Sequence, residues 1–305
     1  MTYLPDAGVA GCNFGVPLQG KVLASLPGTP NSEVTVTLAN PLFGAFAPSE
    51  PFAHVHRWGY DSASSMWGNT GTSTGAVHVA HPDDFTIADV VVGDGSPNSH
   101  FWINASWDDV GSGTSSPRLM RGRTDQNTAA TMGGSFDSIS ALALDADGRA
   151  YVVAKPSGAN YELRRYPSSA AAGTEPSDGE KATLAHATAA PVGSPILGEP
   201  RAGNLSEVYV VTTDGTVHAF DAENMQPLWR ETLLKFNGQP ITIAAKAQPV
   251  LRGNRLWVAS EDGVLYAVVV NSNGLSRSAQ WPTMYRDNCR SNSHYSTQGS
   301  LPSCF

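Results

Sequence analysis

The sequence has 305 residues, of which 15% are charged, 30 are glycine and 21 are proline. The formal net charge of −8 disfavours a nucleic-acid partner, because such a partner requires a basic surface. No apolar run approaches the roughly 18–20 residues that a membrane-spanning helix needs, so no transmembrane segment is predicted. Frequent turn-forming residues instead favour many short strands joined by tight turns.

Near the start of the chain, Val9-Ala10-Gly11-Cys12 resembles a bacterial lipoprotein cleavage box, in which the cysteine carries lipid. Neither a basic start nor an apolar stretch precedes it, as a signal peptide requires. We therefore favour a chance resemblance, with a remnant of a longer precursor as the alternative. Three states of Cys12 stay open: a free thiol, a lipidated cysteine in a longer precursor, or a disulfide-paired cysteine.

The first eighty residues contain four β-rich runs, whose grouping the sequence does not settle: Lys21–Ser25, Glu33–Leu38, Ala53–Trp58 and Ala76–Ala80. The N-terminal half also concentrates aromatic residues. If exposed, they would stack on sugar rings or on a peptide, whereas packing between sheets is the favoured alternative. These candidate binding aromatics are Trp58, Tyr60, Trp67, Trp102 and Trp107.

Two groups of residues invite a metal-site interpretation. His54 and His56 alternate on a predicted strand and share one face, but no third zinc ligand is identifiable by spacing. The acidic pairs Asp83-Asp84 and Asp108-Asp109 lack the spaced pattern of a calcium loop. We therefore expect no metal site, and we interpret these side chains as polar strand faces and solvated turns.

Strands separated by turn residues continue through Asp83–Asp125 and Ser138–Tyr166, the latter with a hairpin turn at Asp147-Gly148. The clearest unit is Ser194–Leu233. Its four predicted strands start near Pro195, Glu207, Thr216 and Pro227. Asp214-Gly215 forms its central hairpin turn, because glycine accepts a positive φ.

The same layout follows in Gln248–Trp281, with a hairpin turn at Asp262-Gly263, 48 positions after Asp214-Gly215. Four strands per unit and a period near ~40–50 residues are typical of β-propeller blades. We therefore predict one all-β domain over residues 1–305, a β-propeller of four-stranded antiparallel blades. Six or seven blades are expected, with seven favoured.

The last two units resemble the pyrroloquinoline-quinone (PQQ)-type propeller repeat, over about a quarter of the chain. The resemblance rests on Asp214-Gly215, His218-Ala219, Asp221-Ala222 and Trp229, followed by Asp262-Gly263, Tyr266-Ala267 and Trp281. The second unit departs from the pattern, with Val268-Val269 in place of an Asp-Ala pair. By resemblance, Trp229 and Trp281 lie on outer strands and pack between blades.

Cys289 and Cys304 lie fifteen positions apart in a Ser/Asn-rich segment of low apolar content. A disulfide there would stabilise the tail, residues 282–305, by about 3 kcal/mol in the chain-entropy model. This pairing favours an oxidising, extracytoplasmic compartment, either secreted or periplasmic, with association to an outer membrane as a further alternative. Pairing with Cys12 and three unrelated thiols remain the alternatives.

The PQQ-type repeat family includes quinoprotein dehydrogenases that hold PQQ beside Ca²⁺, and these would be the cofactors if the chain were such an enzyme. Those enzymes carry adjacent cysteines, which this sequence lacks, and their fold does not imply their activity. We therefore predict a non-catalytic binding or scaffold module for protein or carbohydrate, monomeric and without a cofactor. The alternative is an enzyme, either quinoprotein-like or carbohydrate-active.

Overall fold

The computed structural model describes residues 20–27, 33–39, 54–61, 66–69, 84–93, 100–109, 114–123, 129–184, 189–201, 205–245 and 247–284. Apart from one short 3-10 helix, η2 (Asp178–Glu180), the regular elements in these ranges are β-strands. No helix in this part of the chain is long and apolar enough to span a membrane. The predicted all-β class is confirmed.

The described strands form five antiparallel sheets, and the first two follow the chain order. The β1–β4 sheet contains β1 (Gly20–Pro27), β2 (Glu33–Ala39), β3 (His54–Asp61) and β4 (Met66–Asn69). The β5–β8 sheet contains β5 (Asp84–Gly93), β6 (His100–Asp109), β7 (Thr114–Arg123) and β8 (Ala129–Thr131). The predicted strand at Ala76–Ala80 lies outside the described residues.

The next two sheets have five strands each. The β9–β13 sheet contains β9 (Phe136–Ile139), β10 (Ala143–Leu144), β11 (Ala150–Pro156), β12 (Glu162–Tyr166) and β13 (Lys181–Thr183). The β14–β17 sheet contains β14 (Ile196–Pro200), β15 (Glu207–Val211), β16 (Thr216–Asp221) and β17 (Pro227–Thr232), with β21 (Ser272–Leu275) on its β14 edge.

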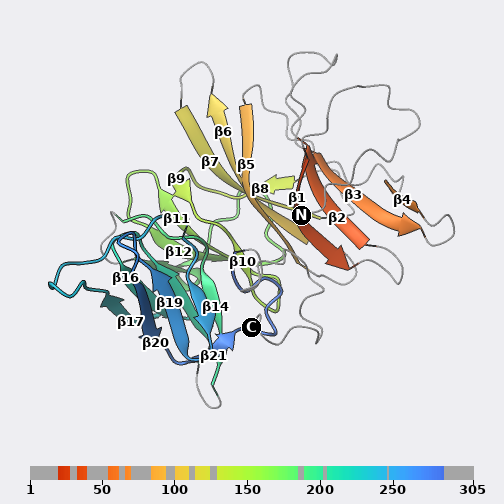
Figure 1. Ribbon diagram of the computed structural model, residues 1–305. Helices are drawn as coiled ribbons and strands as arrows, with labels where there is room; N and C mark the ends of the chain where they lie inside the picture. The colour runs from red at the N-terminus through yellow and green to blue at the C-terminus, as the bar shows by residue number, and fades with distance from the viewer. Residues whose placement is uncertain are drawn as a thin grey trace.

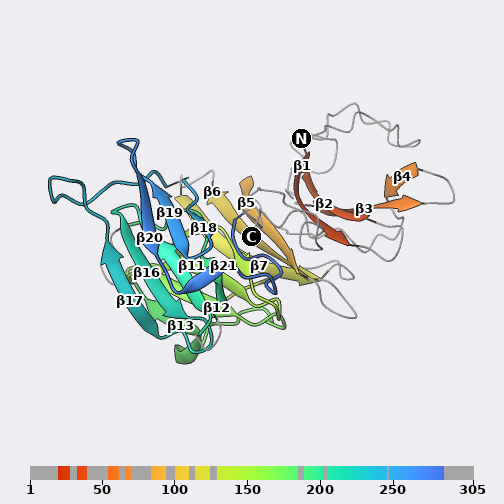
Figure 2. The ribbon, with the colours of Figure 1, turned by 60° about the horizontal axis from the view of Figure 1, so that its bottom comes forward.

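The last sheet has three strands, β18 (Val250–Arg252), β19 (Arg255–Ala259) and β20 (Leu265–Val269). Both views place the β5–β8 sheet between the β1–β4 sheet and the three later sheets (Figure 1, Figure 2). The predicted closure into a ring and the predicted seven blades are not confirmed by the five sheets described.

The four later sheets stack face to face, because alternate residues of each strand enter different hydrophobic clusters. On β11, Val152 packs toward the β5–β8 sheet and Val153 toward the β14–β17 sheet. On β15, Val210 packs back toward the β9–β13 sheet, whereas Val211 packs forward toward the β18–β20 sheet. The β9–β13 and β14–β17 sheets therefore contribute apolar residues to a core on each of their two faces.

The last repeat departs from the four-stranded unit predicted for Gln248–Trp281. In the preceding repeat, the Asp221 carboxylate accepts a hydrogen bond from the backbone N–H of Glu223 at 2.8 Å, at the turn that leads into β17. At the 48-position offset of the two hairpin turns, the corresponding residue of the last repeat is Val269, one position later than the resemblance placed it, and its side chain has no acceptor to stabilise such a turn. The chain instead continues into β21, which pairs with β14 rather than with β20.

The residues after β21 run along β10 and β14, one strand from each of two sheets. Ser276 donates its N–H to Leu197 at 2.8 Å, and Leu197 donates to Pro282 at 2.8 Å. Leu144 and Trp281 exchange both backbone hydrogen bonds, at 2.7 and 3.0 Å. This C-terminal segment, residues 276–284, thereby satisfies buried backbone groups of β10 and β14 that would otherwise lack partners.

Candidate functional site

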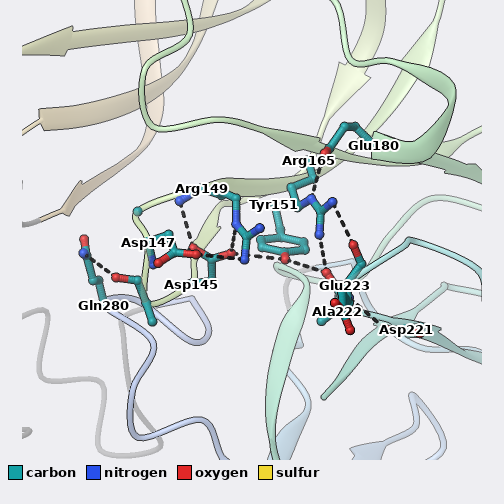
Figure 3. Close-up of polar contacts among 12 residues, drawn as sticks. Asp145, Asp147, Arg149, Tyr151, Arg165, Glu180, Asp221, Ala222, Glu223 and Gln280 are labelled. Atoms are coloured by element: carbon teal, nitrogen blue, oxygen red, sulfur yellow. Dashed lines mark hydrogen bonds and ion pairs between the residues drawn. The ribbon is translucent and has the colours of Figure 1, made fainter. Parts of the chain in front are cut away.

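A buried guanidinium connects the β9–β13 sheet to the β14–β17 sheet. Arg165 on β12 is 3% exposed. It forms an ion pair with Glu180 and donates hydrogen bonds to the carbonyls of Ala222 and Glu223, the latter at 3.0 Å (Figure 3). Burial alone would lower the pKa of Arg165, but hydrogen bonds to Glu180 and Tyr151 raise it overall, so it stays charged.

Tyr151 on β11 extends the same network. Its hydroxyl lies 3.1 Å from the Ala222 carbonyl and 3.3 Å from the Asp145 carboxylate, which also pairs with Arg149 at 2.6 Å (Figure 3). Burial raises the pKa of Tyr151 to about 12, and the negative charge of Asp145 adds to this effect, against the opposing charge of Arg165. The hydroxyl is therefore protonated at neutral pH.

This network is best explained as a joint between two sheets. Its guanidinium groups are paired with carboxylates, its tyrosine holds its proton, and its contacts across the interface are to backbone carbonyls. A catalytic group needs a pKa near the working pH or a free nucleophile within reach of a base. Tyr151 and Arg165 have pKa values far above neutral, so both keep their protons at neutral pH and act as hydrogen-bond donors between the sheets.

The three predicted hairpin turns connect neighbouring strands of their sheets. Asp147-Gly148 lies between β10 and β11, Asp214-Gly215 between β15 and β16, and Asp262-Gly263 between β19 and β20. The glycines have φ values of 72°, 78° and 83°. In the first two turns, a nearby aspartate also binds backbone N–H groups: Asp145 binds Asp147, and Asp214 binds Thr216.

The two tryptophans assigned by resemblance occupy different kinds of position. Trp229 lies on the outer strand β17, half-buried, with its ring 6.1 Å from that of Tyr209, against the core shared with the β18–β20 sheet. Trp281 is not on an outer strand, because the chain leaves β20 to pair with β14. It lies in the C-terminal segment, 1% exposed, within the core between the β5–β8 and β9–β13 sheets.

One of the candidate binding aromatics is excluded by its burial. Trp102 on β6 is fully buried, so it presents no ring to a ligand, because the β9–β13 sheet packs against it. Trp58 and Tyr60 lie on β3, Trp67 on β4 and Trp107 on β6, but their side chains are outside the described set. Cys12, Cys289 and Cys304 are also outside it, as is the tail from residue 285 onward.

The side chains on which the metal interpretations depend lie outside the described set, and only their place on strands is given. Asp84 lies opposite Asp108 in the β5–β6 register, and His54 and His56 lie on β3 beside β2. Elsewhere, within the described side chains, no group of three or more His, Cys, Asp or Glu could hold a metal ion.

The structure shows an exposed apolar surface that the sequence did not predict. This surface is the outward face of the β18–β20 sheet. Tyr266 and Val268 of β20 pack toward the β14–β17 sheet. Leu265, Ala267 and Val269 alternate with them and point the other way, where Leu265 is 60% and Val269 is 70% exposed. This face is apolar and exposed, unlike the opposite face of the same sheet.

The neighbouring strands continue the outward face. In register, Ala267 lies beside Trp257 of β19, which lies beside Val250 of β18, and both are half-buried. Two exposed arginines, Arg252 and Arg255, line up with Val269 at one end. The face is therefore an apolar strip with a basic end.

The edge of β20 is open as well, since β20 pairs with β19 alone among the described strands. Val264 accepts a hydrogen bond from Ser260, and Val270 donates one to Asn254, at 2.9 Å each. In an antiparallel ladder, alternate residues bond to the same neighbour. Tyr266 and Val268 thus bond to β19, and Leu265, Ala267 and Val269 direct their N–H and C=O groups to the open edge.

No protein-family model matches the chain, and no curated protein matches it significantly. Solved structures match at low similarity. BBS1N in complex with ARL6DN has a TM-score of 0.41 and 10% identity, over 83% of this chain and 79% of that chain. PorZ of the Porphyromonas gingivalis type-IX secretion system has a TM-score of 0.40 and 11% identity, over 79% of this chain and 37% of that chain.

The GDP-Man-dependent mannosyltransferase MPT-1 of Leishmania mexicana has a TM-score of 0.31 and 12% identity, over 84% of this chain and 88% of that chain. The strand pairing of the chain itself, rather than a likeness at these TM-scores, defines its architecture.

Proposed function

We propose that this protein is a binding or scaffold module that engages a protein partner through the outward face of the β18–β20 sheet. The observation that carries the proposal is the exposure of Leu265 and Val269 on a sheet whose other face is buried. An exposed apolar face with polar surroundings is typical of protein interaction sites. Burying it would stabilise a complex in proportion to the apolar area removed from water.

A protein partner is favoured over a carbohydrate by the chemistry of this face. Carbohydrate sites stack sugar rings on exposed aromatic faces, whereas the aromatic residue of this face, Trp257, is half-buried between aliphatic neighbours. The open backbone edge of β20 adds hydrogen-bonding groups that an extended peptide can use. Aliphatic side chains and a strand edge together suit a polypeptide ligand.

The test is a selection of binding peptides from a random display library on the immobilised full-length chain. We expect selected peptides to bind about tenfold or more weakly to a Leu265→Lys, Val269→Lys double variant, since a tenfold loss is only about 1.4 kcal/mol. The matched control is Leu205→Lys, which changes an exposed leucine (49% exposed) before β15 and should leave binding unchanged.

Two results would overturn the proposal. One is a set of selected peptides that bind the double variant as tightly as the original chain. The other is the absence of peptide ligands together with saturable, stoichiometric binding of PQQ in the presence of Ca²⁺, or of a glycan on an array. The second result would favour the enzyme or carbohydrate-binding alternatives.

We further propose an extracytoplasmic location, supported by the predicted Cys289–Cys304 disulfide and the resemblance to PQQ-type repeats. Thiol titration of the chain purified from its native compartment, under denaturing and non-reducing conditions, tests it. One reactive thiol per chain, with Cys289 and Cys304 linked in a peptide map, is expected. Three reactive thiols would contradict the proposal.

A further inference from the structure

The open edge of β20 lacks the features by which proteins usually prevent edge strands from pairing. Such edges commonly carry charged residues or proline. Another edge strand, β17 of the preceding sheet, has Pro227, Arg230 and Glu231. By contrast, Val264–Val270 reads VLYAVVV, with no charge, proline or glycine. A segment of this kind pairs readily with another copy of itself.

The charges beside β20 indicate the direction of such a pairing. Arg255 lies opposite Val269, so the C-terminal end of the strand is basic. Exposed Glu261 and Asp262 precede the N-terminal end, and Lys235 pairs with Asp262 at 3.4 Å, which leaves Glu261 to carry the negative charge. Antiparallel pairing places the basic end of one copy near the acidic end of the other. Parallel pairing would bring like charges together.

The backbone geometry favours a register with two-fold symmetry. Leu265, Ala267 and Val269 direct their N–H and C=O groups outward, and Ala267 is the middle residue of the three. If Ala267 lies opposite Ala267 of another copy, Leu265 of each strand lies opposite Val269 of the other. Each of these pairs can then exchange both backbone hydrogen bonds, as residues of a symmetric interface must.

We propose that two copies of this chain associate by antiparallel pairing of their β20 strands, with Ala267 at the two-fold axis. The pairing joins two three-stranded sheets into one continuous sheet. The inference rests on the proposed function, since it uses the outward face of the same sheet: the dimer joins two such faces into one apolar surface for a protein partner. In the dimer the β20 edge is taken by the second copy, so an extended peptide that uses this edge competes with dimerisation. It departs from the monomer expected from the sequence.

Sedimentation equilibrium of the full-length chain tests the pairing. We expect a monomer–dimer equilibrium in which Ala267→Pro weakens dimerisation about tenfold or more. Proline removes an N–H that faces the open edge and is not used by β19, so the sheet itself should be retained. Leu205→Lys should leave the equilibrium unchanged, and circular dichroism of each variant should match that of the original chain.

A second variant keeps the test decisive if Ala267→Pro fails to fold. Ala267→Cys should give an intermolecular disulfide on mild oxidation, because facing residues of a hydrogen-bonded antiparallel pair are about 5.5 Å apart at Cα. Ala259→Cys, on the neighbouring strand, should not exceed the cross-linking of the original chain. Equal cross-linking by both variants, or a monomer at every concentration, would overturn the pairing.

The two proposals fail in different ways. A monomeric chain that still selects peptides sensitive to Leu265→Lys, Val269→Lys would refute the dimer and leave the proposed binding function intact. A dimer sensitive to Ala267→Pro that selects no such peptides would retain the pairing and refute partner binding through the outward face.

Discussion

Arg165 shows how single residues hold the stacked sheets together. Its position on β12 places a charged group beside the apolar cluster between the two sheets, where an unpaired charge would be costly. The cost is offset because Glu180 neutralises the charge and the carbonyls of Ala222 and Glu223 accept the remaining donors. The same contacts fix how the β14–β17 sheet sits against the β9–β13 sheet.

Replacing Arg165 by methionine should destabilise the chain by about 2–3 kcal/mol, because it leaves two interface carbonyls and the half-buried carboxylate of Glu180 without their partner. The free energy of unfolding in urea measures this loss. Arg149→Met is the matched control, since the Arg149 side chain is 37% exposed and its ion pairs should contribute about 1 kcal/mol or less. Similar losses for both variants would contradict the role given to Arg165.

Tyr151 predicts a pH dependence at the same joint. Burial, with the charge of Asp145, raises its pKa from 10.0 to about 12, so the folded chain keeps a proton that the unfolded chain loses. The contribution of Tyr151 to the free energy of unfolding is therefore fully present below pH 10 and is lost as the pH rises from 10 to about 12. Tyr151→Phe should reduce the slope of unfolding free energy against pH in this window. An unchanged slope would refute the assignment.

At the scale of strands and turns, the sequence predicts strands best where clear turn-forming residues separate them. The unit Ser194–Leu233 was predicted to within a few residues, because Asp214-Gly215 and Asp221-Ala222 mark its turns and β-branched residues fill β15. The fourth strand of the next unit was predicted wrongly. Its closing tryptophan, Trp281, matched the pattern, but sequence spacing cannot reveal that an unpaired edge of β14 competes for the same segment.

The outward face could not be found from sequence for a related reason. Leu265, Ala267 and Val269 are apolar, and apolar residues on a predicted strand indicate a core. Whether another sheet covers them is a property of tertiary structure. One signal was present: the last repeat lacks the Asp-Ala pair of the preceding repeat, and none of the described strands forms an outer strand on β20.

The glycines of two hairpin turns should differ in how much a change to alanine destabilises the chain. Gly215 and Gly263 both have positive φ, but a Cβ on Gly215 would lie 2.4 Å from Cγ1 of Ile241, whereas nothing lies within 4 Å of a Cβ on Gly263. Gly263→Ala should cost about 1–2 kcal/mol from backbone strain alone. Gly215→Ala should cost at least ~1 kcal/mol more, because Ile241 is buried and must move. Equal changes in unfolding free energy would contradict this.

At the scale of the molecule, four sheets stack so that each inner sheet is covered on its two faces. The stack ends at the β18–β20 sheet, whose outward face and β20 edge are not covered by any described strand. A β-sheet is stable when at least one face is buried, so the last sheet can fold while leaving the other face for a partner. The proposed binding surface is thus a consequence of where the stack ends.

The central claim is that the β20 edge is open in the free chain, and residue-resolved amide hydrogen exchange by NMR tests it most directly. In dilute solution, the amides of Leu265, Ala267 and Val269 should exchange far faster than those of Tyr266 and Val268, which bond to β19. Protection of the first three should then rise with protein concentration or with a bound peptide. Equal, strong protection of all five amides in dilute protein would show a covered edge and contradict the account.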